Sequence, residues 1–293
     1  MTNHLYGLCI AKNEADIIEF SLGHAAQFCK AIFVLDNGSD DDTWERVIAL
    51  SQENDRIVPF ERKTCQYGVG LRGYIFNRVR SQFKRGDWLL ILDSDEFLES
   101  NPYASIEICE QRGYELLFTF QAQFYITGQD LDQSWCREGF ERVENFDQLP
   151  TFYQINWSEP RLFKYKPSLE WQDMDDTGQP TQVAYPHGLG LRAPFKIVNR
   201  HYQYRSRPQM EKRLALRAKV HVQTGRFKHN QNQDYRRYIR NHRRLKHWDT
   251  GIPIVPTHVD FLRLFLIKRS RKLRRYITER TLEKPCTRQA NVG

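Results

Sequence analysis

The sequence predicts an α/β fold: a mixed, Rossmann-like sheet flanked by helices, followed by a basic helical C-terminal extension. Three observations lead to this prediction. In the first hundred residues, short apolar runs alternate with helical patterns. The order strand, helix, strand, helix is typical of parallel strands joined by right-handed crossovers. Each apolar run also ends in a polar segment, and Lys and Arg are concentrated after residue 200.

The first expected strand covers residues 5–11. It is followed by Lys12-Asn13-Glu14 and by a helical pattern that places Ile17, Ile18 and Leu22 on one side. The second expected strand covers residues 31–35 and runs into an acidic loop that begins at Asp36 and caps a following helix. Further strands are expected at residues 115–120 and around residues 162–163. This pattern brings several polar strand ends to one edge of the sheet.

The third expected strand, Trp88-Leu89-Leu90-Ile91-Leu92, is the most informative because it leads directly into Asp93-Ser94-Asp95-Glu96. Ligands bind at the carboxyl ends of strands in open α/β sheets. Two carboxylates at such an end suit Mg²⁺ or Mn²⁺, which complete their shells with water and phosphate oxygens. A lone Asp-x-Asp sequence also occurs in solvated acidic turns, so a turn is the alternative interpretation.

Together, Ala11-Lys12-Asn13-Glu14, the loop Asp36-Asn37-Gly38-Ser39-Asp40-Asp41-Asp42-Thr43 and Asp93-Ser94-Asp95-Glu96-Phe97 resemble family 2 glycosyltransferases of the GT-A fold. The resemblance covers about a third of the chain, residues 5–100. It implies a nucleotide-sugar-dependent, inverting enzyme in which Asp95 ligates the metal and Asp93 faces ribose and metal. It also implies a nucleotide pocket lined by Ala11, Asn13, Glu14, Asp36 and Ser39.

Four downstream residues are assigned by the same resemblance. The segment 200–206 is similar to a His-Tyr-x-x-Arg-Ser element of one branch of the family, in which His201 completes the metal shell or touches phosphate and Arg205 neutralises diphosphate charge. Arg78 falls where related enzymes keep an arginine near the diphosphate, and Arg161 is a candidate substrate contact. The alternative for each is an ordinary strand residue or surface cation.

The catalytic base is the departure from the family pattern. Related chains place a carboxylate or a His-Glu pair roughly a hundred residues beyond the metal motif, and no His-Glu pair stands there in this chain. The candidates are Asp173, Asp175, Asp176 and His187, with Glu159 farther away in the chain. For each of them an acidic loop or a surface histidine is the competing interpretation.

Composition fits a protein that is made and kept in the cytoplasm. No stretch approaches the roughly 20 apolar residues of a membrane span, and the N-terminus enters a strand without a signal-like segment. The six cysteines form no Cys-x-x-Cys pair, which argues against a zinc site and a disulfide framework. Residues 68–73 contain three glycines and are expected to form a loop; it could close over the donor, or the glycines could simply mark turns.

Positive charge is concentrated in the C-terminal third of the chain, and negative charge in the rest. Residues 201–293 hold 24 Lys/Arg and 6 Asp/Glu, whereas residues 1–200 hold 20 and 30. We expect basic helices at residues 208–222, 233–248 and 258–278. The last helix is amphipathic. It could bind peripherally to the anionic inner face of a membrane, or it could pack on the enzyme's own sheet. Nucleic acid is an unlikely partner because no nucleic-acid module is recognisable.

We therefore predict a glycosyltransferase domain at residues 1–207, with a nucleotide-binding half (1–100) and an acceptor-binding half (101–207), and a basic helical extension at residues 208–293. The expected reaction moves a sugar from a nucleotide diphosphate sugar to a hydroxyl of a glycan, of a lipopolysaccharide or capsule precursor, or of a lipid-linked acceptor. Mn²⁺ or Mg²⁺ would assist an inverting displacement. The alternatives are a nucleotidyltransferase and a non-catalytic protein that uses its basic helices to bind nucleic acid or an anionic membrane. A dinucleotide-dependent oxidoreductase is disfavoured because no G-x-G-x-x-G follows the first strand.

Overall fold

The computed structural model describes residues 3–224, 232–267 and 269 of the 293-residue chain. Its described strands form one sheet in the order β3-β2-β1-β4-β7-β6-β8-β5, with β9 paired to β7. The strands are β1 (Leu5–Ala11), β2 (Ala31–Asp36), β3 (Ile57–Arg62), β4 (Trp88–Asp93), β5 (Glu96–Leu98), β6 (Leu116–Tyr125), β7 (Phe152–Lys164), β8 (Arg192–His201) and β9 (Lys246–His247).

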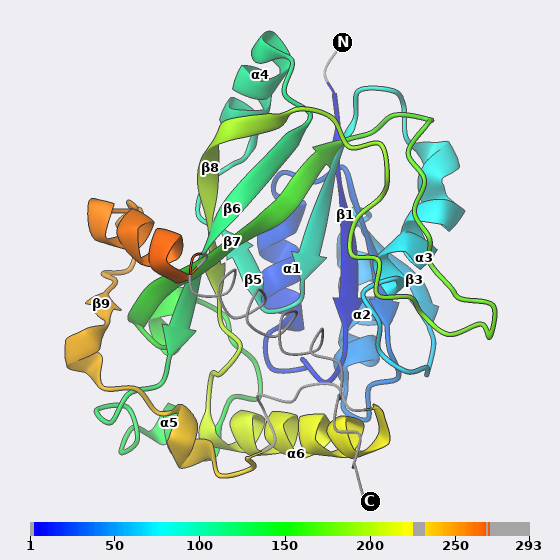
Figure 1. Cartoon of the computed structure of the whole chain (residues 1–293). Coiled ribbons are helices and arrows are strands. Elements are labelled where there is room, and N and C mark those ends of the chain that lie inside the picture. The colour runs from blue at the N-terminus through cyan, green and yellow to red at the C-terminus, as the bar shows by residue number, and fades with distance from the viewer. Residues whose placement is uncertain (1–2, 225–231, 268, 270–293) are drawn as a thin grey trace, which may run out of the picture.

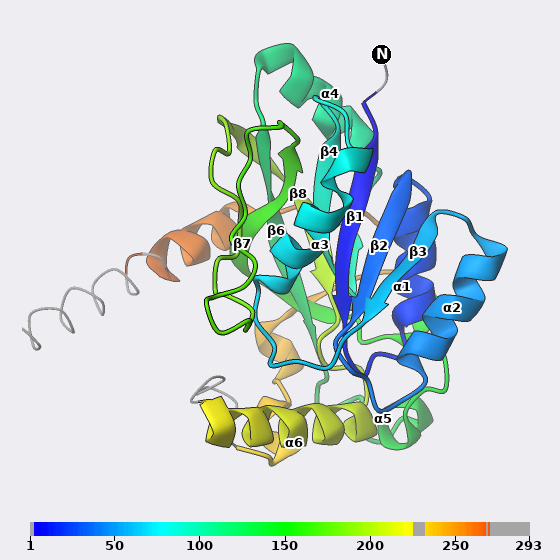
Figure 2. The ribbon, with the colours of Figure 1, turned by 90° about the vertical axis from the view of Figure 1, so that its right-hand side faces the viewer.

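Helices cover both faces of the sheet (Figures 1 and 2). Apolar residues of α1, α2 and α4 pack with Leu5 and Cys9 on one face, while those of α3 pack with Leu8 and Ile10 on the other. The α-helices are α1 (Ile18–Ala26), α2 (Thr43–Glu53), α3 (Leu71–Val79), α4 (Tyr103–Arg112), α5 (Ser134–Glu138) and α6 (Arg207–Thr224). Short 3-10 turns lie at η1 (Arg80–Gln82), η2 (Phe146–Gln148), η4 (Tyr235–Tyr238) and η5 (His242–Arg244). The predicted mixed α/β sheet flanked by helices is confirmed.

The three strand ends singled out in the sequence lie side by side. β1 pairs in parallel with β2 and with β4, and the register sets Ala11 opposite Asp36 and Ile10 opposite Asp93. In both views of the ribbon, α6 runs past this edge of the sheet (Figures 1 and 2). The edge formed by these strand ends is called the rim below.

The sheet must curl strongly between β4 and β5. These strands are separated by three others in the sheet order, which in a flat sheet would place them about 19 Å apart at the usual strand spacing. Only Ser94 and Asp95 connect them in the chain, and three Cα steps reach at most about 11 Å. Asp95 therefore sits where the sheet folds back on itself.

The C-terminal part follows the predictions in part. The first basic helix is confirmed as α6, and residues 258–267 are helical, while the rest of the third predicted helix lies outside the described residues. The helix predicted at residues 233–248 is wrong. Asp234 and Asn241 accept hydrogen bonds from backbone N–H groups two residues on, which favours short 3-10 turns, and Lys246 and His247 pair with β7.

Among the residues that can be described, no helix has the length and apolar character needed to cross a membrane. The division of the chain at residue 207 stays a prediction.

Candidate functional site

Hydrogen bonds join the loop after β1 (residues 12–14) to the loop after β2 (residues 37–40). These two loops are called the cradle below. Asn13 has φ 56°, an uncommon conformation for a residue other than glycine, and such outliers are frequent at ligand sites. Its backbone N–H donates to Ser39 Oγ over 2.9 Å, and its side-chain oxygen accepts from Asp40 N over 2.9 Å. Lys12 Nζ donates to the carbonyl oxygens of Asn37 and Gly38, each at 2.9 Å. The predicted residues Asn13 and Ser39 are thus in direct contact.

Asp36 shapes this cradle. Its carboxylate is fully buried and accepts hydrogen bonds from the backbone N–H groups of Gly38 and Ser39, both at 2.9 Å, and from the Ser39 hydroxyl. The Arg62 guanidinium lies 3.6 Å from the same carboxylate. Ala11, one strand away, is buried beside it.

Asp93 is held between two arginines. Arg72 Nη2 lies 2.5 Å from one carboxylate oxygen, and Arg161 Nη2 lies 2.8 Å from the other. Burial alone would raise the pKa of Asp93, but the charges of Arg161 and Arg72 hold it well below its usual range. Asp93 is therefore ionised at neutral pH, and the two guanidinium groups place positive charge at the rim.

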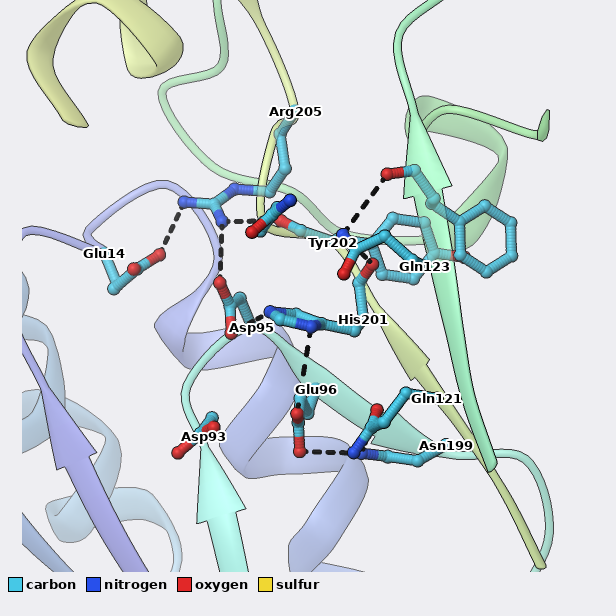
Figure 3. Close-up of polar contacts among 12 residues, drawn as sticks. Glu14, Asp93, Asp95, Glu96, Gln121, Gln123, Asn199, His201, Tyr202 and Arg205 are labelled. Carbon is cyan, nitrogen blue, oxygen red and sulfur yellow. Dashed lines mark hydrogen bonds and ion pairs between the residues drawn. The ribbon is translucent and has the colours of Figure 1, made fainter. Parts of the chain in front are cut away.

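Three cations lie beside Asp95. His201 Nε2 lies 3.3 Å from its Oδ1, and Arg205 Nη1 lies 3.9 Å from its Oδ2 (Figure 3). Arg213 Nη1 of α6 lies 3.2 Å from the same Oδ2. Burial would raise the pKa of Asp95, but His201 and Arg213 lower it. Burial likewise opposes protonation of His201, but Asp95 raises its pKa. Two predicted metal ligands, Asp95 and His201, are thus brought together.

Arg205 links the start of α6 to the loop after β1. It is fully buried and forms a bidentate pair with Asp16, at 2.7 and 2.8 Å, together with a 2.6 Å contact to Glu14 Oε2. Its Nη1 donates to Tyr202 O over 2.9 Å. Burial raises the pKa of Glu14 to about 6, against the lowering effect of Arg205. In this arrangement, Arg205 pairs with protein carboxylates.

A row of buried polar side chains continues from the rim across the sheet (Figure 3). Glu96 accepts from Arg161 and, over 2.6 Å, from Asn199; Asn199 donates to Gln121 over 3.2 Å. Gln121 donates in turn to Glu159 over 2.9 Å. Burial raises the pKa of Glu96 to about 8, although Arg161 acts in the opposite direction. These residues form a polar wall beside Asp93 and His201.

The rim residues fit a divalent cation that is bound jointly with a substrate. Asp95 Oδ2 is buried and accepts no hydrogen bond from any described residue, although the guanidinium groups of Arg213 and Arg205 lie 3.2 and 3.9 Å from it. Asp93, in contrast, accepts hydrogen bonds from two guanidinium groups. Within the described ranges, no three His, Cys, Asp or Glu side chains gather closely enough to hold a metal by themselves. Mg²⁺ commonly takes one or two carboxylates and fills its shell with phosphates and water, so Asp95 with His201 beside it is a sufficient protein contribution.

The remaining predicted residues are Arg78 and the base candidates Asp173, Asp175, Asp176 and His187. Arg78 contacts Asp173 Oδ2 at 3.2 Å, and its guanidinium stacks 3.4 Å from the ring centroid of Tyr74. Asp176 and His187 are exposed, and the His187 backbone pairs with Glu170. Among the described residues, no side-chain hydrogen bond or ion pair joins them to Asp93 or Asp95.

Sequence reasoning missed several rim residues. Arg72 lies in the first turn of α3, in a stretch expected to be a loop. Arg213 reaches Asp95 from α6. Glu96 could have been predicted as a site residue, since it directly follows the Asp-x-Asp sequence. Nothing in the sequence around Arg213 predicts its contact with Asp95, because that contact depends on where α6 packs.

Comparison with known proteins gives a likeness of fold alone. No protein-family model matches the chain, and no curated protein matches it by sequence. Similar solved structures include the mannosyltransferase PcManGT from Pyrobaculum calidifontis in complex with GDP-Man and Mn²⁺, at 12% identity over 77% of this chain and 65% of that one, with a TM-score of 0.39. TarS 1–349 of S. aureus in complex with UDP-GlcNAc gives 14% identity over 75% and 66%, with a TM-score of 0.38.

Glucosyl-3-phosphoglycerate synthase of M. tuberculosis gives 20% identity over 42% of this chain and 45% of that one, with a TM-score of 0.28. The chain covers less than two thirds of the length of each of these three structures.

Proposed function

We propose that this chain is a glycosyltransferase that moves a sugar from a nucleoside diphosphate sugar to an acceptor hydroxyl. The observation that carries the proposal is the meeting of three parallel strand ends at one rim. There the rigid Asn13–Ser39 cradle lies beside Asp93 and Asp95. A nucleoside in the cradle would direct its diphosphate toward the carboxylates and arginines that follow β4.

The rim has the charge that a diphosphate leaving group needs. Arg72, Arg161 and Arg213 approach Asp93 or Asp95 within 3.2 Å, and guanidinium groups bind phosphate through planar forks of donors. Mg²⁺ or Mn²⁺ at Asp95 and His201 would supply further charge stabilisation to the departing diphosphate. Fixed charges aimed at a developing anion lower the barrier without reorganising during the reaction.

The acceptor would lie on the side of the polar wall. Trp157 stands 6.0 Å from His201 in an edge-on arrangement, and its indole N–H donates to Glu159 over 3.0 Å. The Glu159 side chain is 28% exposed, so it can meet a bound hydroxyl. We propose Glu159 as the base of an inverting displacement, ahead of Asp173, Asp175, Asp176 and His187, because Arg161 contacts both Glu159 and Asp93.

The first experiment measures the melting temperature with a panel of nucleoside diphosphates and their sugars, with and without Mn²⁺. A ligand at a hundred times its Kd stabilises the native state by about 2.7 kcal/mol, which corresponds to roughly 5 °C or more for a chain of this size. We expect one base to stabilise strongly, and Asp95→Asn to abolish the part that needs metal.

Glu138→Gln is the matched control, because it also removes one negative charge and Glu138 is exposed away from the rim. The proposal fails if no nucleotide on the panel shifts the melting temperature, or if Asp95→Asn and Glu138→Gln behave alike.

A further inference from the structure

A second cavity lies beyond the rim, at the far end of β6 and β7. It has a volume of about 480 Å³, the size of many small-ligand pockets. One side is formed by the sheet and the other by the segment that carries η4 and η5. Its lining residues are Tyr125, Gln154, Asn156, Ile239, Arg240, Asn241, Arg244 and Leu245.

This cavity and the rim share one face of the sheet. Gln121, Gln123 and Tyr125 alternate along β6, and alternate residues of a strand point to the same face. Gln121 belongs to the polar wall, Gln123 donates to the His201 carbonyl over 3.3 Å, and Tyr125 lines the cavity. From Gln123 to Tyr125 is about 7 Å at the usual strand rise. A ligand of sugar size in the cavity would therefore lie next to His201.

The cavity offers positive charge together with neutral hydrogen-bonding groups. Arg240 and Arg244 both line it, and within the described residues neither forms an ion pair with an acidic side chain. The Arg240 guanidinium lies 5.5 Å from the centroid of the Tyr125 ring. Asn156 donates to the Tyr125 hydroxyl. Amides and a phenol suit hydroxyl groups, whereas arginine forks without a carboxylate partner suit an oxyanion.

Hydrogen bonds to their backbone groups hold Arg240 and Arg244 in place beside the sheet. Arg240 N donates to Ile126 O over 3.0 Å, and Gln154 Nε2 donates to Arg244 O over 3.3 Å. The segment is thus attached to both strands that form the floor of the cavity. A helix at residues 233–248 would not make these contacts.

We propose that this cavity is the acceptor subsite and that it binds a carbohydrate carrying an oxyanion, either a phosphate or a carboxylate. The inference rests on the proposed transferase function, because it assigns the hydroxyl-bearing substrate to this end of the same face. Arg240 and Arg244 hold the oxyanion, while Asn156 and Gln154 bind sugar hydroxyls.

The test uses the full chain and titrates three probes by calorimetry: glucose 6-phosphate, glucuronate and neutral glucose. At least one charged probe should bind about tenfold or more tightly than glucose, as expected for a charge-assisted contact. Arg240→Gln with Arg244→Gln should remove that preference. The control, Arg236→Gln with Arg237→Gln, removes the same charge from exposed residues of the neighbouring turn and should keep it.

Three results would overturn the subsite: equal binding of all three sugars, loss of binding in both double variants, or, in a fourth titration, binding of inorganic phosphate as tight as that of glucose 6-phosphate. Whichever of the two charged probes binds more tightly identifies the oxyanion. Nucleotide-dependent stabilisation is measured on the same variants and should not change. If a charged sugar binds through Arg240 and Arg244 while no nucleotide binds, the cavity is a binding site for charged sugars, but the transferase proposal and with it the acceptor role fall. If a nucleotide binds and neither charged sugar does, only the subsite is rejected.

Discussion

Replacing Arg205 with methionine should be among the most damaging single changes to stability in this chain. The guanidinium is fully buried and donates to Glu14 and to both oxygens of Asp16. Methionine fills similar space but leaves Asp16 without its cation, while Glu14 keeps only its contact with Arg213. Removing one member of a buried ion pair costs about 3–5 kcal/mol, a large share of the roughly 5–15 kcal/mol that holds a typical domain folded.

Urea unfolding at pH 7 measures the effect. At a denaturant slope of about 2 kcal/mol per molar, the transition midpoint should fall by about 1.5–2.5 M. Adding Asp16→Asn to the Arg205→Met variant should recover part of the loss, because the carboxylate that loses its cation is then removed. Arg207→Gln is the control: Arg207 pairs with Glu211 on the surface of α6, and the midpoint should not move measurably. A loss below about 1 kcal/mol for Arg205→Met would refute the reasoning from buried ion pairs.

Three further changes test other parts of the structure. Leu90→Ala empties a buried position in β4 and should cost about 2–5 kcal/mol in the free energy of unfolding, measured in urea. Gly38→Ala should destabilise the cradle by more than about 1 kcal/mol, because Gly38 has φ 72° and an added Cβ would lie 2.4 Å from Thr64 Oγ1; unchanged stability would contradict this. Burial would raise the pKa of Asp260, but hydrogen bonds led by that from Lys246 lower it. Its stabilising contribution is therefore complete above the unfolded pKa of about 3.9 and is lost as pH falls through the folded value. The stability advantage of the wild type over Asp260→Asn should accordingly shrink between pH 7 and pH 3, and an advantage independent of pH would rule the interpretation out.

The sequence was most informative where local pattern and tertiary packing agree. β1, β2 and β4 were predicted within a residue or so, because continuous apolar runs followed by turn residues mark buried parallel strands. The contact of Asn13 with Ser39 follows from the convergence of strand ends, which the order of elements already implied. The contact of Asp95 with His201 comes from the pairing of β5 with β8, and His201 was expected only from the family resemblance.

The rest depended on contacts that no local window contains. Residues 233–248 have a helix-like distribution of arginines, yet backbone pairing with β6 and β7 and the side-chain bonds of Asp234 and Asn241 favour turns and a short strand. Arg72 and Arg213 reach the rim from helices that are distant in sequence. Which cation meets which carboxylate is decided by how those helices pack on the sheet.

The two-residue link between β4 and β5 makes the rim sensitive to the shape of the whole sheet. Ser94 and Asp95 are a connection of fixed length between a central strand and an edge strand, so flattening of β7, β6 and β8 would pull Asp95 away from Asp93 or break the pairing of β5 with β8. By thermodynamic linkage, the curvature of the sheet affects ligand binding at the rim, and ligand binding affects the curvature. A ligand that holds Asp95 against its neighbours also stabilises this curvature. The amide hydrogens of Phe97 and Glu99, which face β8 and lie far from any nucleoside, should then exchange more slowly when the rim is occupied.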